Sequence, residues 1–130
     1  MVKGYEKNQA RLQALSLLGK DLARRARSHC ELCGTSGVRF KTREVEPVPE
    51  EPELAHCLLV CENCDLELDR RGGFEPAYWR FLETSAWSEE PAVQVCAVRV
   101  LRALDEPWAQ DLLEQLYLWP ESERWLAASG

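Results

Sequence analysis

Two pairs of cysteines with the same spacing constrain this chain of 130 residues more than any other feature. Cys30 and Cys33 lie in "CELCG", Cys61 and Cys64 lie in "VCENC", and 27 residues separate the pairs. A C-x-x-C pair offers two sulfurs from one tight turn, and two such pairs supply the tetrahedron of thiolates that Zn²⁺ prefers. The four cysteines are therefore predicted to bind one zinc ion, which closes a loop and joins the segments that flank it.

Four sulfurs around one ion leave no position for water, so the predicted site is structural and not catalytic. A dithiol redox motif is disfavoured because no βαβ pattern surrounds it, whereas an iron–sulfur cluster stays chemically open. Cys57 and Cys96 are interpreted as buried apolar residues, with Cys57 kept as an alternative ligand if the register differs. His29 and His56 are expected to be exposed and uninvolved, the alternative being a hydrogen bond to the metal-binding region.

The charge is divided unevenly along the chain. Residues 1–43 carry ten lysines and arginines against three acids, whereas residues 44–130 carry six against nineteen, for a total of −6. Most of the surface is thus expected to repel nucleic acid, and only the basic segment opposes this. The candidate nucleic-acid contacts are Lys7, Arg11, Lys20, Arg24, Arg25 and Arg27. The alternative is a basic helix that faces solvent or packs beside the acidic remainder.

The N-terminal residues are too charged for the apolar part of a signal peptide, and no apolar run is long enough to span a bilayer. A cytoplasmic protein without membrane contact is therefore predicted. In that compartment thiols stay reduced, which favours metal ligation or burial of the cysteines over disulfides.

The length predicts one domain over residues 1–130 with three parts. Residues 1–28 form a basic amphipathic helix, 29–72 the zinc-binding element, and 73–130 a helical region. The stretches "GVRFKTREV" and "HCLLV" predict two strands around an acidic loop with three prolines, and a helix is expected to begin near Cys61. The predicted fold class is α+β, mostly helical, with a small zinc-ribbon or treble-clef-like β element packed against several helices.

Prolines and small polar residues predict where the later helices begin. Pro76 and Pro120 suit first helical positions, and Ser88 and Asp105 are expected to cap the two helices between them. Apolar residues then recur at helical spacing, with Cys96 on one such stripe.

The order of C-x-x-C, strand, loop, C-x-x-C and helix resembles the zinc-braced frame of the HNH endonucleases in outline. That chemistry needs a histidine base and ligands for a second metal. Glu44, Glu46 and Asp65 occupy the corresponding places, but no histidine accompanies them. The three acids are interpreted as solvated side chains, and a degenerate HNH-like nuclease is kept as an alternative.

Longer stretches resemble the PhnA-like proteins of bacteria, which are named for an alkylphosphonate utilisation operon. The stretches are "CELCG", "EVEPVP", "VCENC", "YWRFLETSAWSEEPAVQVCAVRVLRAL" and "WAQDLLEQLYL", and the resemblance covers about residues 28–126. It implies that Cys30, Cys33, Cys61 and Cys64 are zinc ligands, and it implies no catalytic residue. Longer relatives continue into a small β-rich C-terminal domain that is missing here.

The sequence thus favours a non-enzymatic zinc module with an interaction or regulatory role and a protein partner. A nucleic-acid-binding zinc protein that uses the basic helix is the first alternative. An HNH-like nuclease or a phosphonate-related hydrolase is the second. The oligomeric state is left open.

Overall fold

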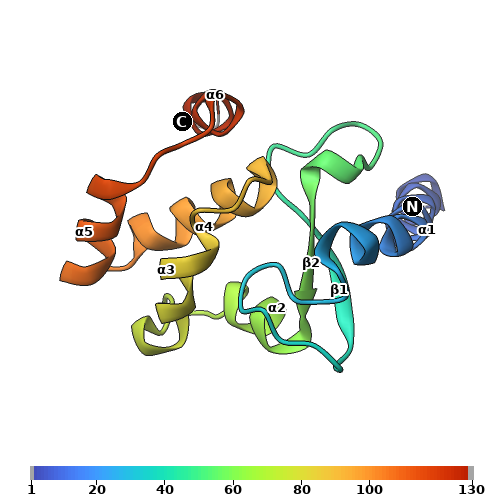
Figure 1. The fold of residues 1–130 in the computed structure, drawn as a ribbon. Coiled ribbons are helices and arrows are strands. Elements are labelled where there is room, and N and C mark those ends of the chain that lie inside the picture. Colours follow the sequence, from blue (N-terminus) through green and yellow to red (C-terminus); the bar gives the residue numbers. More distant parts are fainter. Residues whose placement is uncertain (1, 129–130) are drawn as a thin grey trace.

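A two-stranded antiparallel hairpin lies between a long N-terminal helix and a group of shorter helices (Figure 1). In this computed structural model residues 2–128 are described, and side chains are described for residues 7–128. The elements before the second half of the chain are α1 (Val2–Ala26), β1 (Phe40–Glu44), the 3₁₀ helix η1 (Leu54–His56), β2 (Cys57–Cys61) and α2 (Glu62–Leu68). They are followed by the 3₁₀ helix η2 (Pro76–Phe81), α3 (Leu82–Ser85), α4 (Pro91–Ala103), α5 (Pro107–Gln115) and α6 (Pro120–Ala128). The predicted fold class is confirmed.

Strand β2 is buried along its whole length because helices cover both of its faces. Side chains of a strand alternate between the two faces of a sheet. Cys57 and Leu59 accordingly pack with Leu22 of α1, while Leu58 and Val60 join the larger core with α4. The hairpin therefore separates two apolar clusters, and its register pairs Phe40 with Cys61 and Glu44 with Cys57.

Helix α4 is buried on nearly all sides, which the single predicted stripe does not anticipate. Its buried residues run without a break from Ala92 to Val98 and include the polar Gln94. A helix that is covered all round lies at the centre of a core rather than at its edge. α4 is packed by α3, α5, α6 and β2, so it is the axis of the helical half (Figure 1).

The predicted caps of α4 and α5 are wrong by one or two residues. Glu90 precedes α4 and Glu106 precedes α5, and in each case the next residue is a proline at the first helical position. Proline favours this position because its fixed φ suits the helix and its missing N–H has no partner to lose there. It also holds the preceding residue in an extended conformation, so that residue, and not Ser88 or Asp105, marks the boundary. Pro76 does open a helix, but of the 3₁₀ type, and Pro120 opens α6 as predicted.

Within the described part of the chain, no helix has the length and apolar character needed to cross a bilayer.

Candidate metal centre

The four predicted cysteines come together at one point of the fold. Their sulfur atoms all lie within 4.8 Å of one another, and Cys33 Sγ lies 3.7 Å from Cys61 Sγ. Cys30, Cys61 and Cys64 are buried, whereas Cys33 is half-buried. Among the residues with described side chains, this is the one cluster of cysteines, histidines and acids that is suited to hold a metal ion.

The first two sulfurs come from a tight turn that precedes the hairpin. The N–H of Cys30 donates to the carbonyl of Thr35, and the N–H of Gly34 donates to the carbonyl of Cys30. Gly34 has a φ of 81°, in the left-handed region that glycine adopts without a steric penalty. This fold of the backbone also directs the N–H of Cys33 toward Cys30 Sγ, at 3.5 Å.

The other two sulfurs come from the junction of β2 with α2. Cys61 ends the strand and caps the helix, since its Sγ accepts a hydrogen bond from the N–H of Cys64 at 3.4 Å. Because Cys64 lies in the first turn of α2, its sulfur faces the same point as that of Cys61. The arrangement of turn, hairpin and helix is treble-clef-like, as predicted from the sequence.

Glu31, the residue after the first cysteine, ties the turn to the outer edge of β2. Its N–H donates to the carbonyl of Leu59, and its side chain accepts the N–H of Leu59, both at 2.8 Å. Arg25 of α1 holds the same carboxylate with two nitrogens, at 2.6 and 3.0 Å, and also donates to the carbonyl of Cys57. This partly buried pair joins three segments, so the helix, the turn and the strand are held in one arrangement.

A tyrosine from η2 completes the surroundings of the cluster. The hydroxyl of Tyr78 donates to Cys64 Sγ at 3.2 Å. Burial, together with this bond, raises the pKa of Tyr78, so the hydroxyl keeps its proton and remains a donor. A donor of this kind orients the ligand and stabilises the negative charge of a thiolate.

The sulfurs influence one another strongly. A hydrogen bond from Cys64 lowers the pKa of Cys30 to about 4, and the same bond raises the pKa of Cys64. Burial raises the pKa of Cys33 to about 11. Four negative charges at these separations repel one another, so all four thiolates form together only around a cation.

The donor set fits one tetrahedral ion. Zinc–sulfur bonds of about 2.3 Å give a tetrahedron with edges of about 3.8 Å. The distance of 3.7 Å between Cys33 Sγ and Cys61 Sγ agrees with such an edge. The four cysteines are therefore positioned to bind a single metal ion.

The remaining cysteines and both histidines lie outside the cluster. Cys57 is fully buried beside α1, and burial raises its pKa to about 11. Cys96 is part of the larger core, as predicted. His29 is exposed as expected, whereas His56 is half-buried, with its ring 4.5 Å from that of Trp125.

Two of the three acids considered for a second metal are not solvated, which corrects the sequence interpretation. The carboxylate of Glu44 accepts hydrogen bonds from two nitrogens of Arg11, at 2.5 and 2.8 Å. Asp65 accepts a hydrogen bond from Arg43 at 3.0 Å. Glu46 is exposed, as expected. Arginines that lie far away in the sequence thus occupy the carboxylates that a hard cation would need.

The six basic residues predicted as nucleic-acid contacts, five in α1 and Arg27 just after it, divide into two groups. Arg11 and Arg25 are directed into the protein, where they hold Glu44 and Glu31 and donate to backbone carbonyls. The exposed residues are Lys7, Lys20, Arg24 and Arg27. The predicted contacts that remain accessible are therefore these four.

No family model, curated protein or solved structure matches this chain. The four clustered cysteines can nevertheless be identified from their spacing alone. The sequence does not identify the roles of Glu31, Arg25 and Tyr78, because each of them contacts a partner that only the folded chain brings close. The position of Glu31 inside the first C-x-x-C pair is the one local signal that could have pointed to it.

Proposed function

We propose that the chain is a non-enzymatic zinc module in which one structural Zn²⁺ bound by Cys30, Cys33, Cys61 and Cys64 holds the hairpin together. The observation that carries the proposal is the cluster of four sulfurs within 4.8 Å of one another, with three of the four cysteines buried. Four sulfurs around one Zn²⁺ would fill all of its ligand positions. A closed tetrathiolate contributes folding free energy and offers no position to a reactant. The resemblance to the PhnA-like proteins is carried over for these four ligands only.

Metal analysis tests the centre directly. The purified protein is expected to contain one zinc ion per chain, because the four thiolates saturate a single ion. Replacement by Co²⁺ is expected to give the intense visible bands of tetrahedral cobalt, with sulfur-to-metal charge transfer in the near ultraviolet. Iron with visible absorption of its own would point to an iron–sulfur cluster instead, and a protein free of metal would contradict the proposal.

The surface beside α1 supports a protein partner. A groove of about 560 Å³ lies between α1 and β1, with an apolar floor that includes Leu15, Phe40 and Leu59. Its helical wall runs over Leu12, which is half-exposed, and Gly19, which leaves open space. An apolar floor suits a side chain of a protein better than it suits a phosphate.

The charge beside the groove sets the chemistry of that partner. Lys41 lies on the strand side. Lys20 is exposed one helical turn from the groove-lining Ser16, and Arg27 is exposed directly after the end of α1. In a protein with a net charge of −6, this basic border around an apolar floor favours an acidic segment with an apolar face.

Nucleic acid is the second candidate partner, favoured by the four exposed basic residues in and directly after α1. Binding of this kind rests on phosphate contacts and weakens steeply with added salt. It does not depend on the apolar floor of the groove, and this difference separates the two candidates.

Binding to two defined probes decides between them. The probes are a synthetic amphipathic helix with glutamate and leucine faces and a duplex DNA of unrelated sequence, measured by fluorescence anisotropy at two salt concentrations. The acidic peptide is expected to bind, and Leu12→Asp is expected to weaken it about tenfold, or about 1.4 kcal/mol. Lys20→Glu combined with Arg27→Glu should weaken it similarly, whereas Arg102→Glu, an exposed change on α4, serves as the control.

A different result would identify nucleic acid as the partner. DNA binding would then weaken with salt, stay unchanged in Leu12→Asp and disappear when both charges are reversed. Absence of binding to both probes would remove the groove from consideration as a docking surface.

A further inference from the structure

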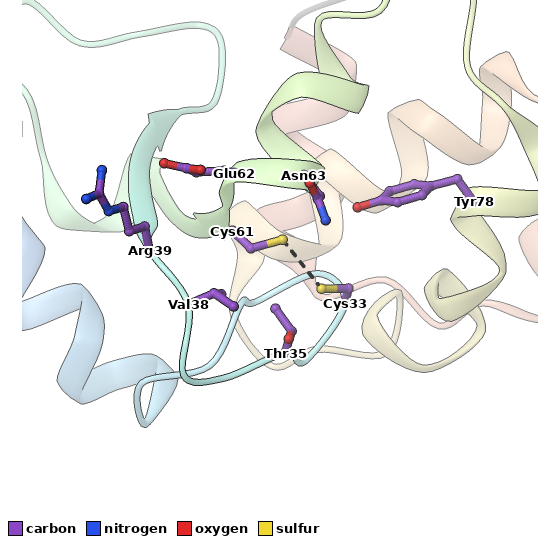
Figure 2. Close-up of a pocket in the computed structure, with 8 residues that line it drawn as sticks. All are labelled: Cys33, Thr35, Val38, Arg39, Cys61, Glu62, Asn63 and Tyr78. Atoms are coloured by element: carbon purple, nitrogen blue, oxygen red, sulfur yellow. Dashed lines mark hydrogen bonds between the residues drawn. The ribbon is translucent and has the colours of Figure 1, made fainter.

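The four sulfurs of the metal centre are not equally accessible. A cavity of about 230 Å³ opens beside the cluster, and of the four cysteines only Cys33 and Cys61 line it (Figure 2). Cys33 is half-buried, whereas the exposed fractions of Cys61, Cys30 and Cys64 are 4%, 2% and 0%. A small molecule in this cavity therefore reaches Cys33 first, with Cys61 in the lining of the same cavity, whereas Cys30 and Cys64 do not line it.

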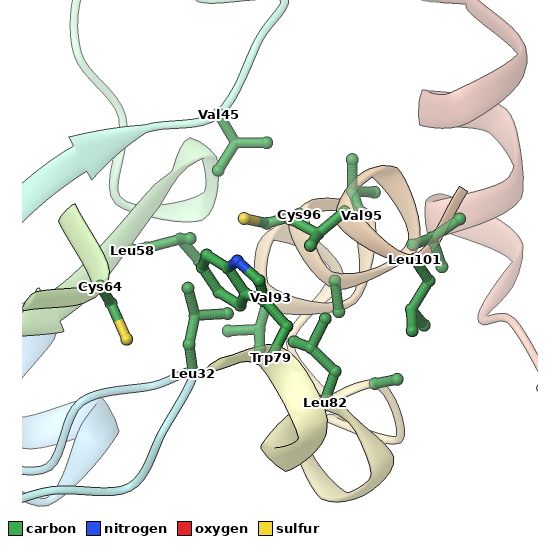
Figure 3. Close-up of a cluster of buried hydrophobic side chains, with 14 of the residues drawn as sticks. Leu32, Val45, Leu58, Cys64, Trp79, Leu82, Val93, Val95, Cys96 and Leu101 are labelled. Carbon is green, nitrogen blue, oxygen red and sulfur yellow. The ribbon is translucent and has the colours of Figure 1, made fainter. Parts of the chain in front are cut away.

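The two cysteines outside the cavity lining are covered by packing and by hydrogen bonds. Cys64 lies in the large apolar core together with Leu32 and Trp79 (Figure 3). Cys30 and Cys61 belong to the same core, but only Cys61 also lines the cavity. Cys64 Sγ also carries the hydrogen bond from Tyr78. The cavity has a different lining: Thr35 and Asn63 place polar side chains around the two sulfurs that line it (Figure 2). A small polar oxidant suits this opening.

We propose that Cys33 and Cys61 form an oxidation site for hydroperoxides, at which the two sulfurs join and the zinc ion leaves. The proposal rests on the zinc centre proposed above. Cys33 reacts first because its sulfur is the most exposed of the four, and reactivity toward peroxides follows thiolate character and exposure. Cys61 then resolves the product, since its sulfur is 3.7 Å away and faces the same cavity.

The electrons and atoms balance in two steps. The Cys33 thiolate attacks the terminal oxygen of a hydroperoxide ROOH, so an S–O bond forms, the O–O bond breaks, and RO⁻ leaves and takes a proton to become ROH. The Cys61 thiolate then attacks the sulfenic sulfur of Cys33, the S–S bond forms, and hydroxide leaves as water after taking a second proton. Two thiolates have lost two electrons to one peroxide. Zn²⁺ keeps only the Cys30 and Cys64 ligands and is released.

The two other cysteines provide an internal control. Cys57 and Cys96 are buried outside the sulfur cluster, and burial raises the pKa of each, so both remain protonated thiols at neutral pH. Cys33 differs because the zinc ion of the proposed centre holds it as a thiolate. A thiol is a much weaker nucleophile than a thiolate. Neither is expected to react while the zinc centre is being oxidised.

The test treats zinc-loaded protein with hydrogen peroxide and follows zinc release with a chromogenic chelator. Samples are quenched early with acid and alkylated, and the disulfides are mapped by mass spectrometry without reduction. The expected product is a Cys33–Cys61 disulfide that appears at the rate of zinc release. A link within either C-x-x-C pair, earlier oxidation of Cys57 or Cys96, or resistance to peroxide would each overturn the proposal.

A matched pair of variants tests the role of the cavity. Val38→Trp places a large side chain in the lining of the cavity, where Val38 is 49% exposed. We expect unchanged zinc content and zinc release slowed by at least about fivefold, because access to Cys33 is reduced. Val48→Trp is the control, since Val48 is 45% exposed in the proline loop and does not line the cavity. Equal rates in the two variants would contradict entry through this opening.

Zinc content before oxidation separates the two proposals. A protein without metal would overturn the zinc centre and this inference together. A fully loaded protein that does not form the Cys33–Cys61 link overturns the oxidation site and leaves the zinc centre standing.

Discussion

Replacement of Cys64 by serine is expected to abolish zinc binding and to unfold the hairpin with the turn and helix that supply its ligands. The sulfur of Cys64 is fully buried and lies at the start of α2, so no solvent molecule can take its place without opening the core. Structural zinc contributes on the order of 10 kcal/mol in small zinc domains, and a two-stranded hairpin is marginal by itself. The free energy lost with the metal is therefore comparable with the whole stability of a domain.

The measurements are the zinc-to-protein ratio and the emission of tryptophan during unfolding. Trp79 is a good reporter because it is fully buried in the same core as Cys64 (Figure 3). Its emission is expected to shift to longer wavelength in Cys64→Ser and in wild-type protein stripped by a chelator. A Cys64→Ser variant with wild-type zinc content and stability would show that the metal is not a structural element.

Cys57→Ala is the matched control. Cys57 is equally buried and belongs to the same strand as Cys61, but it faces α1 instead of the sulfur cluster. The variant is expected to keep one zinc ion per chain and to lose only about 1 kcal/mol from the reduced packing. Loss of zinc in this variant would mean that Cys57 takes part in ligation.

The second large effect is expected from Gln94→Leu in the centre of α4. The side chain of Gln94 is fully buried and donates to the carbonyls of Ala86 and Tyr117, at 2.9 and 3.1 Å. Its carbonyl accepts the N–H of Trp119 at 3.0 Å. Leucine fills a similar volume but leaves three backbone groups without their partner, at about 1–3 kcal/mol each where they stay buried. The expected loss is about 3–5 kcal/mol.

Denaturant unfolding at a fixed zinc concentration measures this loss. Gln110→Leu is the control, because Gln110 is exposed and makes a single bond of 3.2 Å to the carbonyl of Leu104. The control is expected to change the free energy of unfolding by less than about 1 kcal/mol. Equally small changes in the free energy of unfolding for both variants would contradict this prediction. The three hydrogen bonds of Gln94 would then not hold the segments before α4 and after α5 in place.

Local patterns predicted the metal ligands and the order of the elements. The spacing of four cysteines is sufficient to identify them as one set, because a C-x-x-C turn places both sulfurs on the same side whatever surrounds it. The apolar run in "HCLLV" predicted β2. Prolines 76 and 120 predicted two helix starts, since φ and N–H constraints act within a few residues. The prediction of Ser88 and Asp105 as helix caps was wrong because a proline follows each of them. The fixed φ of that proline determines where the helix begins.

The pairing of charges could not be predicted from the chain. Arg11 and Glu44 are 33 residues apart, and Arg43 and Asp65 are 22 apart, yet each pair is in direct contact. Sequence composition shows a basic N-terminal part and an acidic remainder, but it does not show which charges face each other. In the folded chain, two of the six basic residues and two of the three candidate acids form partly buried ion pairs within the protein.

By itself the sequence determined which four cysteines belong together, the hairpin and the succession of helices, since each follows from spacings within one turn or one strand. Only the tertiary structure decided that α4 lies at the centre of the core, that Tyr78 donates to Cys64, and that Cys33 and Cys61 line a cavity. The physical reason is that burial and access depend on every segment that packs around a group. Those segments are distant in the chain, and no local rule brings them together.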